Sequence, residues 1–179
     1  MMTAMKPLLS LLALIVTMGT ATPTAMPTSD PPGKLGMWEG RWHFSGQIYE
    51  TAYSRAHSDT GTADCLWTSN RGYLICDYFS DNPPHDDLAI LSYSAVAKMY
   101  TLVNLHKDKP PVRSVIAQHG NTWVTSADVP DKGNMLIMQT FFRFLSADQQ
   151  TTTVQVSADK GKTWTRIIEV TGVKVRGSA

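Results

Sequence analysis

The chain has 179 residues, enough for one domain and short for two. Lys and Arg total 16 against 15 Asp and Glu, and this formal charge of +1 gives no basic field of the kind that recognises nucleic acid. With 42% apolar residues, 17% charged residues and five Trp, the composition supports a hydrophobic core and excludes a disordered chain.

The first residues predict a secretory signal peptide. Lys6 precedes an apolar run from Leu8 to Val16, which is shorter than the roughly 20 residues of a membrane span. Gly19-Thr20-Ala21 offers small residues for cleavage, with Ala25 as a second candidate. We therefore expect residues 1–21 to be removed and the protein to be exported to the periplasm or secreted, with no membrane span left after cleavage. A retained anchor is the alternative.

Residues 22–34 are rich in Pro, Thr and Ser and predict a flexible leader. A single domain, residues 35–176, follows. Its first segment, Trp38–Ile48, alternates apolar or Gly residues with polar ones, which is typical of a half-buried strand.

Nine further segments have strand character and are separated by turn sequences rich in Gly, Pro, Asn and Asp. They are 62–68, 73–79, 88–93, 99–106, 112–118, 122–126, 135–145, 151–157 and 163–175. After the signal peptide no segment shows a sustained helical period. About ten short antiparallel strands predict an all-β fold, an up-and-down barrel that closes its own edges.

The two cysteines flank the Asn70-Arg71-Gly72 turn. Cys65 and Cys76 are equally distant from the turn centre, as are the pairs Trp67 with Leu74 and Ala63 with Tyr78. A four-residue loop would make the cysteines the closely spaced type of cross-strand pair that a disulfide requires. An oxidising compartment favours the bridge, and two buried thiols are the alternative.

The order of several short motifs resembles the bacterial domain of unknown function 1579 family, a lipocalin-like (calycin) group. The residues that carry the resemblance are Gly36/Trp38/Gly40, Cys65-Leu66-Trp67, Gly72-Tyr73-Leu74, Tyr93 with Lys98 and Tyr100, and Trp164 with Glu169. The resemblance covers roughly residues 35–176 and implies a lipocalin-like barrel without an agreed activity. It also implies that Trp38 closes the barrel floor, with Lys174 or Arg176 packed over it.

The related nitrobindins hold haem through a His near the end of the chain. The last His in this sequence is His119, so we expect no haem and no other cofactor. His85-Asp86-Asp87 combines metal-ligand types, but adjacent loop residues rarely converge on one ion, and we expect no metal site.

Residues 157–164 match the Asp-box of sialidase propellers, Ser-x-Asp-x-Gly-x-Thr-Trp. Asp159 is expected to accept hydrogen bonds from turn amides, and Gly161 to adopt a positive φ. A propeller requires many more strands than this chain contains. We therefore interpret the motif as a structural turn.

A barrel of eight or more strands can enclose a small ligand or be filled by its own side chains, and the sequence leaves both open. The leading hypothesis is a barrel that binds a small apolar molecule, with no nucleic-acid partner. The predicted cavity lining is Trp42, Phe44, Trp67, Tyr78, Tyr100 and Phe141. One alternative is a hydrolase or isomerase with His43, His106 or Asp77 as acid or base. Another is a filled barrel that acts as a protein-interaction module.

Overall fold

The computed structural model describes residues 31–82, 84–107 and 109–175. A short helix α1 (Pro31–Lys34) and a 3-10 turn η1 (Leu35–Met37) precede ten antiparallel strands. The strands are β1 (Gly40–Ile48), β2 (His57–Trp67), β3 (Tyr73–Asp81), β4 (Pro84–Ser94), β5 (Met99–His106), β6 (Lys109–His119), β7 (Thr122–Asp131), β8 (Asn134–Ser146), β9 (Gln149–Ser157) and β10 (Thr165–Lys174).

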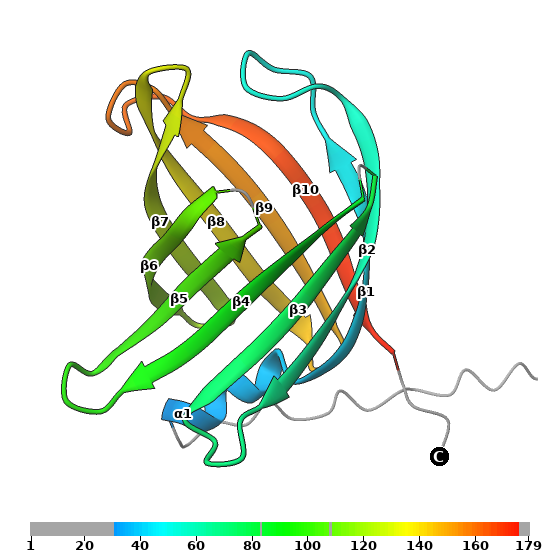
Figure 1. The fold of residues 1–179 in the computed structure, drawn as a ribbon, viewed down its shortest axis with the longest axis vertical. Helices are drawn as coiled ribbons and strands as arrows, with labels where there is room; N and C mark the ends of the chain where they lie inside the picture. Colours follow the sequence, from blue (N-terminus) through cyan, green and yellow to red (C-terminus); the bar gives the residue numbers. More distant parts are fainter. Residues whose placement is uncertain (1–30, 83, 108, 176–179) are drawn as a thin grey trace, which may run out of the picture.

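The strands form a closed up-and-down barrel in which each strand pairs with its sequence neighbours (Figure 1). The barrel closes where β1 pairs antiparallel with β10, with Trp42 opposite Lys174. Closure leaves no unpaired edge among the ten described strands. The all-β fold and the strand number expected from the sequence are confirmed.

The entry to the barrel differs from the strand expected at Trp38. The Trp38 backbone is helical and its N–H bonds to the carbonyl of Leu35, so η1 ends there. Gly40 follows at φ 109°, a conformation that L side chains rarely adopt, and β1 begins at this residue. The turn sends Trp38 across the barrel end instead of along its wall.

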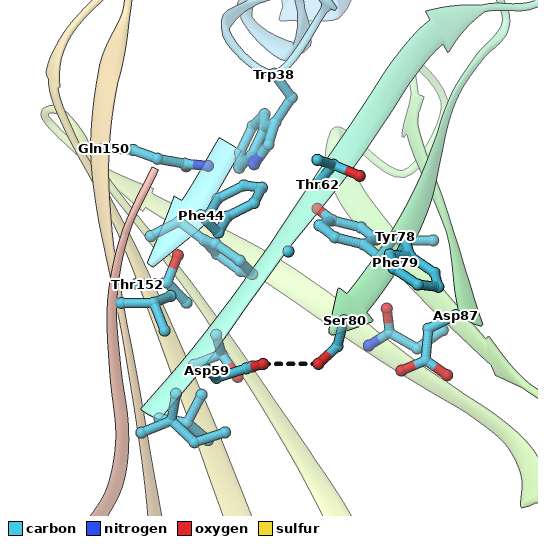
Figure 2. Close-up of a pocket in the computed structure, with 18 of the residues that line it drawn as sticks. Trp38, Phe44, Asp59, Thr62, Tyr78, Phe79, Ser80, Asp87, Gln150 and Thr152 are labelled. Atoms are coloured by element: carbon cyan, nitrogen blue, oxygen red, sulfur yellow. Dashed lines mark hydrogen bonds between the residues drawn. The ribbon is translucent and has the colours of Figure 1, made fainter. Parts of the chain in front are cut away.

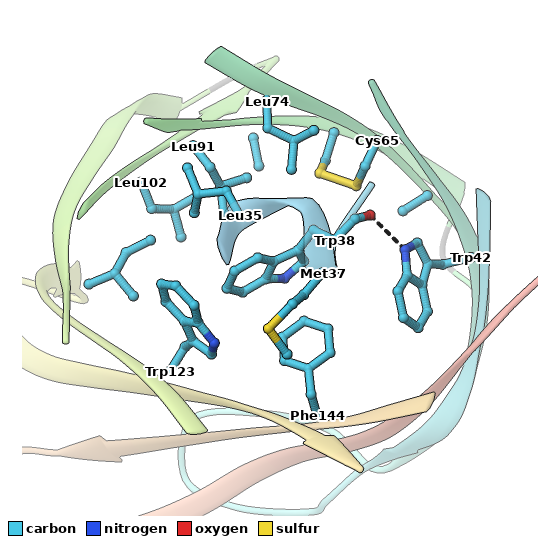
Figure 3. Close-up of a cluster of buried hydrophobic side chains, with 14 residues drawn as sticks. Leu35, Met37, Trp38, Trp42, Cys65, Leu74, Leu91, Leu102, Trp123 and Phe144 are labelled. Atoms are coloured by element: carbon cyan, nitrogen blue, oxygen red, sulfur yellow. Dashed lines mark hydrogen bonds between the residues drawn. A yellow bond between two sulfur atoms is a disulfide. The ribbon is translucent and has the colours of Figure 1, made fainter. Parts of the chain in front are cut away.

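The end of the barrel that lies next to α1, here called the closed end, is filled by apolar side chains (Figure 3). The Trp38 ring packs edge-on against Trp123 and Phe144, with ring centroids 4.9 Å away in each case. Trp42 is fully buried and donates its indole N–H to the Trp38 carbonyl at 2.7 Å. Trp38 therefore closes the floor, as the family resemblance implies.

The basic residue expected above Trp38 lies over a different ring. Lys174 Nζ is 4.8 Å from the centroid of Trp42, a cation–π contact. Burial lowers the pKa of Lys174, while the charges of Asp148 and Glu39 act in the opposite direction. Arg176, the other candidate, lies outside the described residues.

The β2–β3 hairpin has the register expected from its turn. Cys65 pairs with Cys76, Trp67 with Leu74 and Ala63 with Tyr78. The Thr68 amide bonds to the Tyr73 carbonyl, which leaves a four-residue loop between them. The Cα atoms of Cys65 and Cys76 are 4.0 Å apart, and a disulfide joins the two residues within the closed-end core.

The predicted signal peptide, residues 1–21, lies outside the described residues. The predicted leader, residues 22–34, lies outside them except for its last four residues, which form α1. Lys34 at the end of α1 donates a hydrogen bond to Gln118 Oε1 on β6 at 3.2 Å. The described residues contain no helix of sufficient length and hydropathy to traverse a bilayer.

Candidate functional site

A cavity of about 290 Å³ lies inside the barrel, between Trp38 and the end opposite α1, here called the open end (Figure 2). This volume is close to the lower limit of roughly 300–1,000 Å³ for small-molecule sites. Its middle is apolar, with Leu91, Leu102, Phe142 and Val154 among the residues of the wall. The barrel is thus filled at one end and hollow at the other.

The hollow results from the size of the inward-facing side chains. Toward the open end, β2, β3, β8 and β9 direct Gly61, Ser80, Thr140 and Thr152 into the barrel. At the closed end β3 and β8 direct Leu74 and Phe144 inward, and Trp38 and Trp123 fill the space between the strands. Because every second strand position faces inward, the small inward residues toward the open end leave a space there.

Phe44 forms part of the cavity floor, in a position that Gly172 allows. The two residues are cross-strand partners in β1 and β10. A Cβ atom on Gly172 would come within 2.5 Å of the Phe44 ring. The ring also stacks on Trp42, with centroids 6.3 Å apart, and contacts Tyr78 at 6.1 Å. Phe44 is therefore supported from below and presents an apolar surface to the cavity.

Gln150 brings a polar group to the floor of this cavity. Its side chain is 1% exposed, and its Oε1 has no hydrogen-bond partner among the described residues. Figure 2 shows the side chain extending toward Trp38 at the inner end of the cavity. A buried carbonyl oxygen without a partner is unfavourable by about 1–3 kcal/mol.

The outer part of the cavity wall holds the ionisable residues. His106 Nδ1 lies 2.6 Å from Asp87 Oδ1, and His85 Nε2 lies 3.6 Å from the second oxygen of the same carboxylate. Asp59 Oδ1 accepts a hydrogen bond from Ser80 Oγ at 2.7 Å. All five residues line the cavity, and Figure 2 places Asp59, Ser80 and Asp87 at the end opposite Trp38.

Strand register brings three of the polar side chains into one row. Tyr78 on β3 is opposite Asp87 on β4, which is opposite His106 on β5. Burial raises the pKa of Tyr78 to about 12, so its phenol stays protonated and can donate a hydrogen bond inside the cavity. The row thus combines a neutral hydroxyl, a carboxylate and an imidazole along one wall.

The structure brings together only part of the predicted lining. Phe44 and Tyr78 line the cavity, whereas Trp42, Trp67 and Tyr100 do not. Trp42 lies below the floor within the closed-end core, and Trp67 and Tyr100 pack against that core. Their roles are therefore in supporting the floor.

The prediction for Phe141 is corrected by the alternation of β8. Leu136 and Phe144 are buried inside the barrel, so even-numbered positions face inward and Phe141 faces outward. Its neighbour Phe142 lines the cavity instead. Since β8 is apolar on both faces, its sequence does not distinguish the two.

Of the three acid–base candidates, only His106 lines the cavity. His43 and Asp77 are exposed positions of β1 and β3, and neither lines the cavity. The contact of His106 with Asp87 was not predicted from the sequence. Its signal was present, because Asp87 and His106 are as symmetric about the 95–98 turn as the pair Tyr93 and Tyr100.

The Asp-box residues form the turn between β9 and β10 at the open end. Asp159 accepts hydrogen bonds from the Thr163 amide at 2.8 Å, from its hydroxyl at 2.6 Å and from Ser157 Oγ at 2.8 Å. These bonds, the Thr163 hydroxyl first, lower the pKa of Asp159 to about 2. Gly161 has φ 86°, as the turn requires. The geometry is that of a structural turn.

The described residues contain no group of three or more His, Cys, Asp or Glu side chains arranged to hold a metal ion. Asp87, His85 and His106 can take part in hydrogen bonding and proton transfer.

Solved structures of other proteins resemble this barrel in fold, although no sequence match was found. No family model matches the chain, and no curated protein matches it in sequence. Among solved structures, Rv2717c from M. tuberculosis is similar with a TM-score of 0.59 and 13% identity, covering 82% of this chain and 99% of that one. The S-type phycobiliprotein lyase CPES from Guillardia theta is similar with a TM-score of 0.54 and 10% identity, covering 79% and 90%. At these identities the likeness establishes the fold alone, and that fold is a lipocalin-like barrel.

Proposed function

We propose that this protein is an exported carrier or receptor for a small, largely apolar molecule held inside the barrel. The observation that carries the proposal is the cavity itself, whose wall is largely apolar and whose floor includes Gln150, with no hydrogen-bond partner for its Oε1 among the described residues. Contact with the apolar walls would contribute roughly 25 cal/mol for each Å² of ligand surface buried. A few polar groups would fix the orientation of the ligand. Export is proposed from the predicted signal peptide, residues 1–21.

The similarity of fold to a phycobiliprotein lyase supports this proposal in a general way, since the name of that protein refers to an enzyme of bilin-carrying proteins. The ligand of the present chain follows from its own cavity, whose volume of about 290 Å³ favours a molecule smaller than most drugs.

The test compares the native and denatured masses of the protein purified from its producing cells. We expect the native mass to exceed the chain mass by one small molecule, whose fragmentation gives its chemical class. A Thr152→Trp variant should lose this excess, because the indole would fill the cavity beside Phe44. Thr151→Trp is the matched control, since Thr151 is the next residue of β9 and faces outward.

A folded Thr152→Trp variant that retained the molecule would contradict binding inside the barrel. A native mass equal to the chain mass, together with no uptake of added apolar probes, would favour the interaction module over the carrier.

One observation favours a second candidate, a hydrolase on the same barrel. Asp87 accepts a hydrogen bond from His106 in the cavity wall, an arrangement that fixes an imidazole as a general base. In that reaction His106 would take a proton from water as the water oxygen attacks an ester carbon. The imidazolium would then return the proton to the departing alkoxide.

The rate of hydrolysis of p-nitrophenyl octanoate tests this second candidate function. We expect turnover by the native protein and its loss in His106→Gln, with retained turnover in His43→Gln, whose side chain is exposed on β1. Equal rates in the two variants would leave the carrier as the only function that the cavity supports.

A further inference from the structure

The ionisable residues of the cavity wall give it a net negative charge when the imidazoles are neutral. They are two carboxylates, Asp59 and Asp87, two imidazoles, His85 and His106, and the Tyr78 phenol, which stays neutral. No Lys or Arg occurs among the described residues that line the cavity. With both carboxylates ionised, the wall carries a charge of −2 when the imidazoles are neutral and reaches zero only when both are protonated.

The nearest basic residues along the strands do not alter this balance. Lys107 follows β5 and Lys109 begins β6 opposite His106, but both are exposed and neither lines the cavity. Arg166 near the start of β10 is also exposed and bonds to Glu169. These cations are in contact with solvent, which screens their charge from the interior.

The two carboxylates differ in how many of their oxygens contact another polar side chain. Both Asp87 oxygens face an imidazole, at 2.6 and 3.6 Å. Asp59 Oδ1 accepts a hydrogen bond from Ser80, and none of the hydrogen bonds among the described residues reaches its Oδ2. Asp59 is therefore the acceptor best placed to take a further hydrogen bond from a ligand.

From this arrangement we infer that the cavity selects ligands with an apolar body and a cationic head, such as an alkyl amine, and rejects fatty acids. The apolar body lies against Phe44 and Phe142, and the head lies toward Asp59 at the open end. A carboxylate head in the same place would face two carboxylates, with no Lys or Arg among the described lining residues to pair with, and burying such a charge is unfavourable. The inference rests on the proposed carrier function and specifies its ligand class.

Three probes with the same chain and different heads separate the two questions. Octylamine, 1-octanol and octanoate are titrated into the full-length protein at pH 8 by isothermal calorimetry. Binding of 1-octanol reports the cavity with an uncharged head, while the order of the two charged probes reports the charge of the wall. We expect octylamine to bind tightest and octanoate weakest, with about a 10- to 100-fold gap between amine and alcohol, as for one hydrogen bond to a charged group.

Variants assign this preference to its residues. Asp59→Asn keeps the shape of the side chain and removes its charge, so it should bring octylamine close to 1-octanol. Asp86→Asn is the matched control, because Asp86 is an exposed residue of β4 that does not line the cavity. It should preserve the preference of the native protein. Thr152→Trp should abolish binding of all three probes and so excludes surface adsorption.

Octanoate binding as tightly as octylamine, with 1-octanol also bound, would overturn the charge selection and leave the carrier function standing. Equal loss of amine preference in Asp59→Asn and Asp86→Asn would also overturn it, since the effect would then come from surface charge. Failure of all three probes to bind would contradict the carrier function and the ligand class together.

Discussion

The closed and open ends of this barrel are built from the same strands and differ in the side chains that occupy their interior. At the closed end Trp38, Trp123 and Phe144 fill the interior and are almost completely buried. At the open end Gly61, Thr152 and other small residues leave a cavity of about 290 Å³. One end therefore supplies most of the packing that stabilises the fold, and the other end is available for a ligand.

This division teaches that stability and binding can be altered separately in this protein. Fully packed interiors respond strongly to the loss of a few atoms, because the remaining space cannot be refilled. Residues beside an existing cavity have fewer contacts to lose. The predictions below use paired substitutions at the two ends.

The largest expected effect is at the centre of the closed end. Phe144→Ala should lower the free energy of unfolding by about 3–5 kcal/mol, because it removes a fully buried ring that packs against Trp38 and Trp42. Ile168→Ala in the cavity wall should lower it by about 2 kcal/mol or less, since the side chain already borders open space. Urea unfolding of both variants measures the difference. Equal losses of unfolding free energy would contradict the difference in packing between the two ends.

The disulfide of the closed end should have the next largest effect. Replacing both Cys65 and Cys76 by Ala should reduce stability by about 3 kcal/mol, because the bridge closes a short loop in the unfolded chain. Ligand binding at the open end should persist in the folded variant. Urea midpoints of the native protein with and without a reducing agent give an independent value, and a native protein insensitive to reduction would contradict the estimate.

The smallest effect is expected at the Asp-box turn of the open end. Because hydrogen bonds hold the pKa of Asp159 at about 2 against an ordinary value of 3.8, its carboxylate stabilises the fold above about pH 4. That contribution should disappear as the pH falls from about 4 through about 2. Carboxyl NMR gives the titration midpoint, which Thr163→Val should raise by removing one of the donors. A midpoint near 3.8 in the native protein would contradict the turn geometry.

Features that depend on symmetry about a turn, or on the alternation of apolar and polar residues, could be predicted from the sequence. The register of Cys65 with Cys76 followed from their equal distance to one turn, and the short two-residue alternations located the strands. The inward face of β8 did not follow, because apolar residues occur on both of its faces and only the closed barrel shows that Phe142 faces inward.

The cavity was unpredictable for a different reason. Whether a barrel is filled depends on the summed volume of side chains from all ten strands and on the position of Trp38, which a 3-10 turn places across the floor. The pairing of Asp87 with His106 was available from the symmetry of the 95–98 turn, but the sequence does not state which face of those strands points inward.

The seam between β1 and β10 has a consequence for the order of folding. Every other strand pair joins sequence neighbours and can form as a hairpin, whereas the seam joins the first strand to the last. Contacts between distant parts of a chain form slowly, because the loop between them must first lose its freedom. Seam closure is therefore expected to limit the folding rate, and a nascent chain still lacking β10 presents the inner apolar face of the sheet to its surroundings.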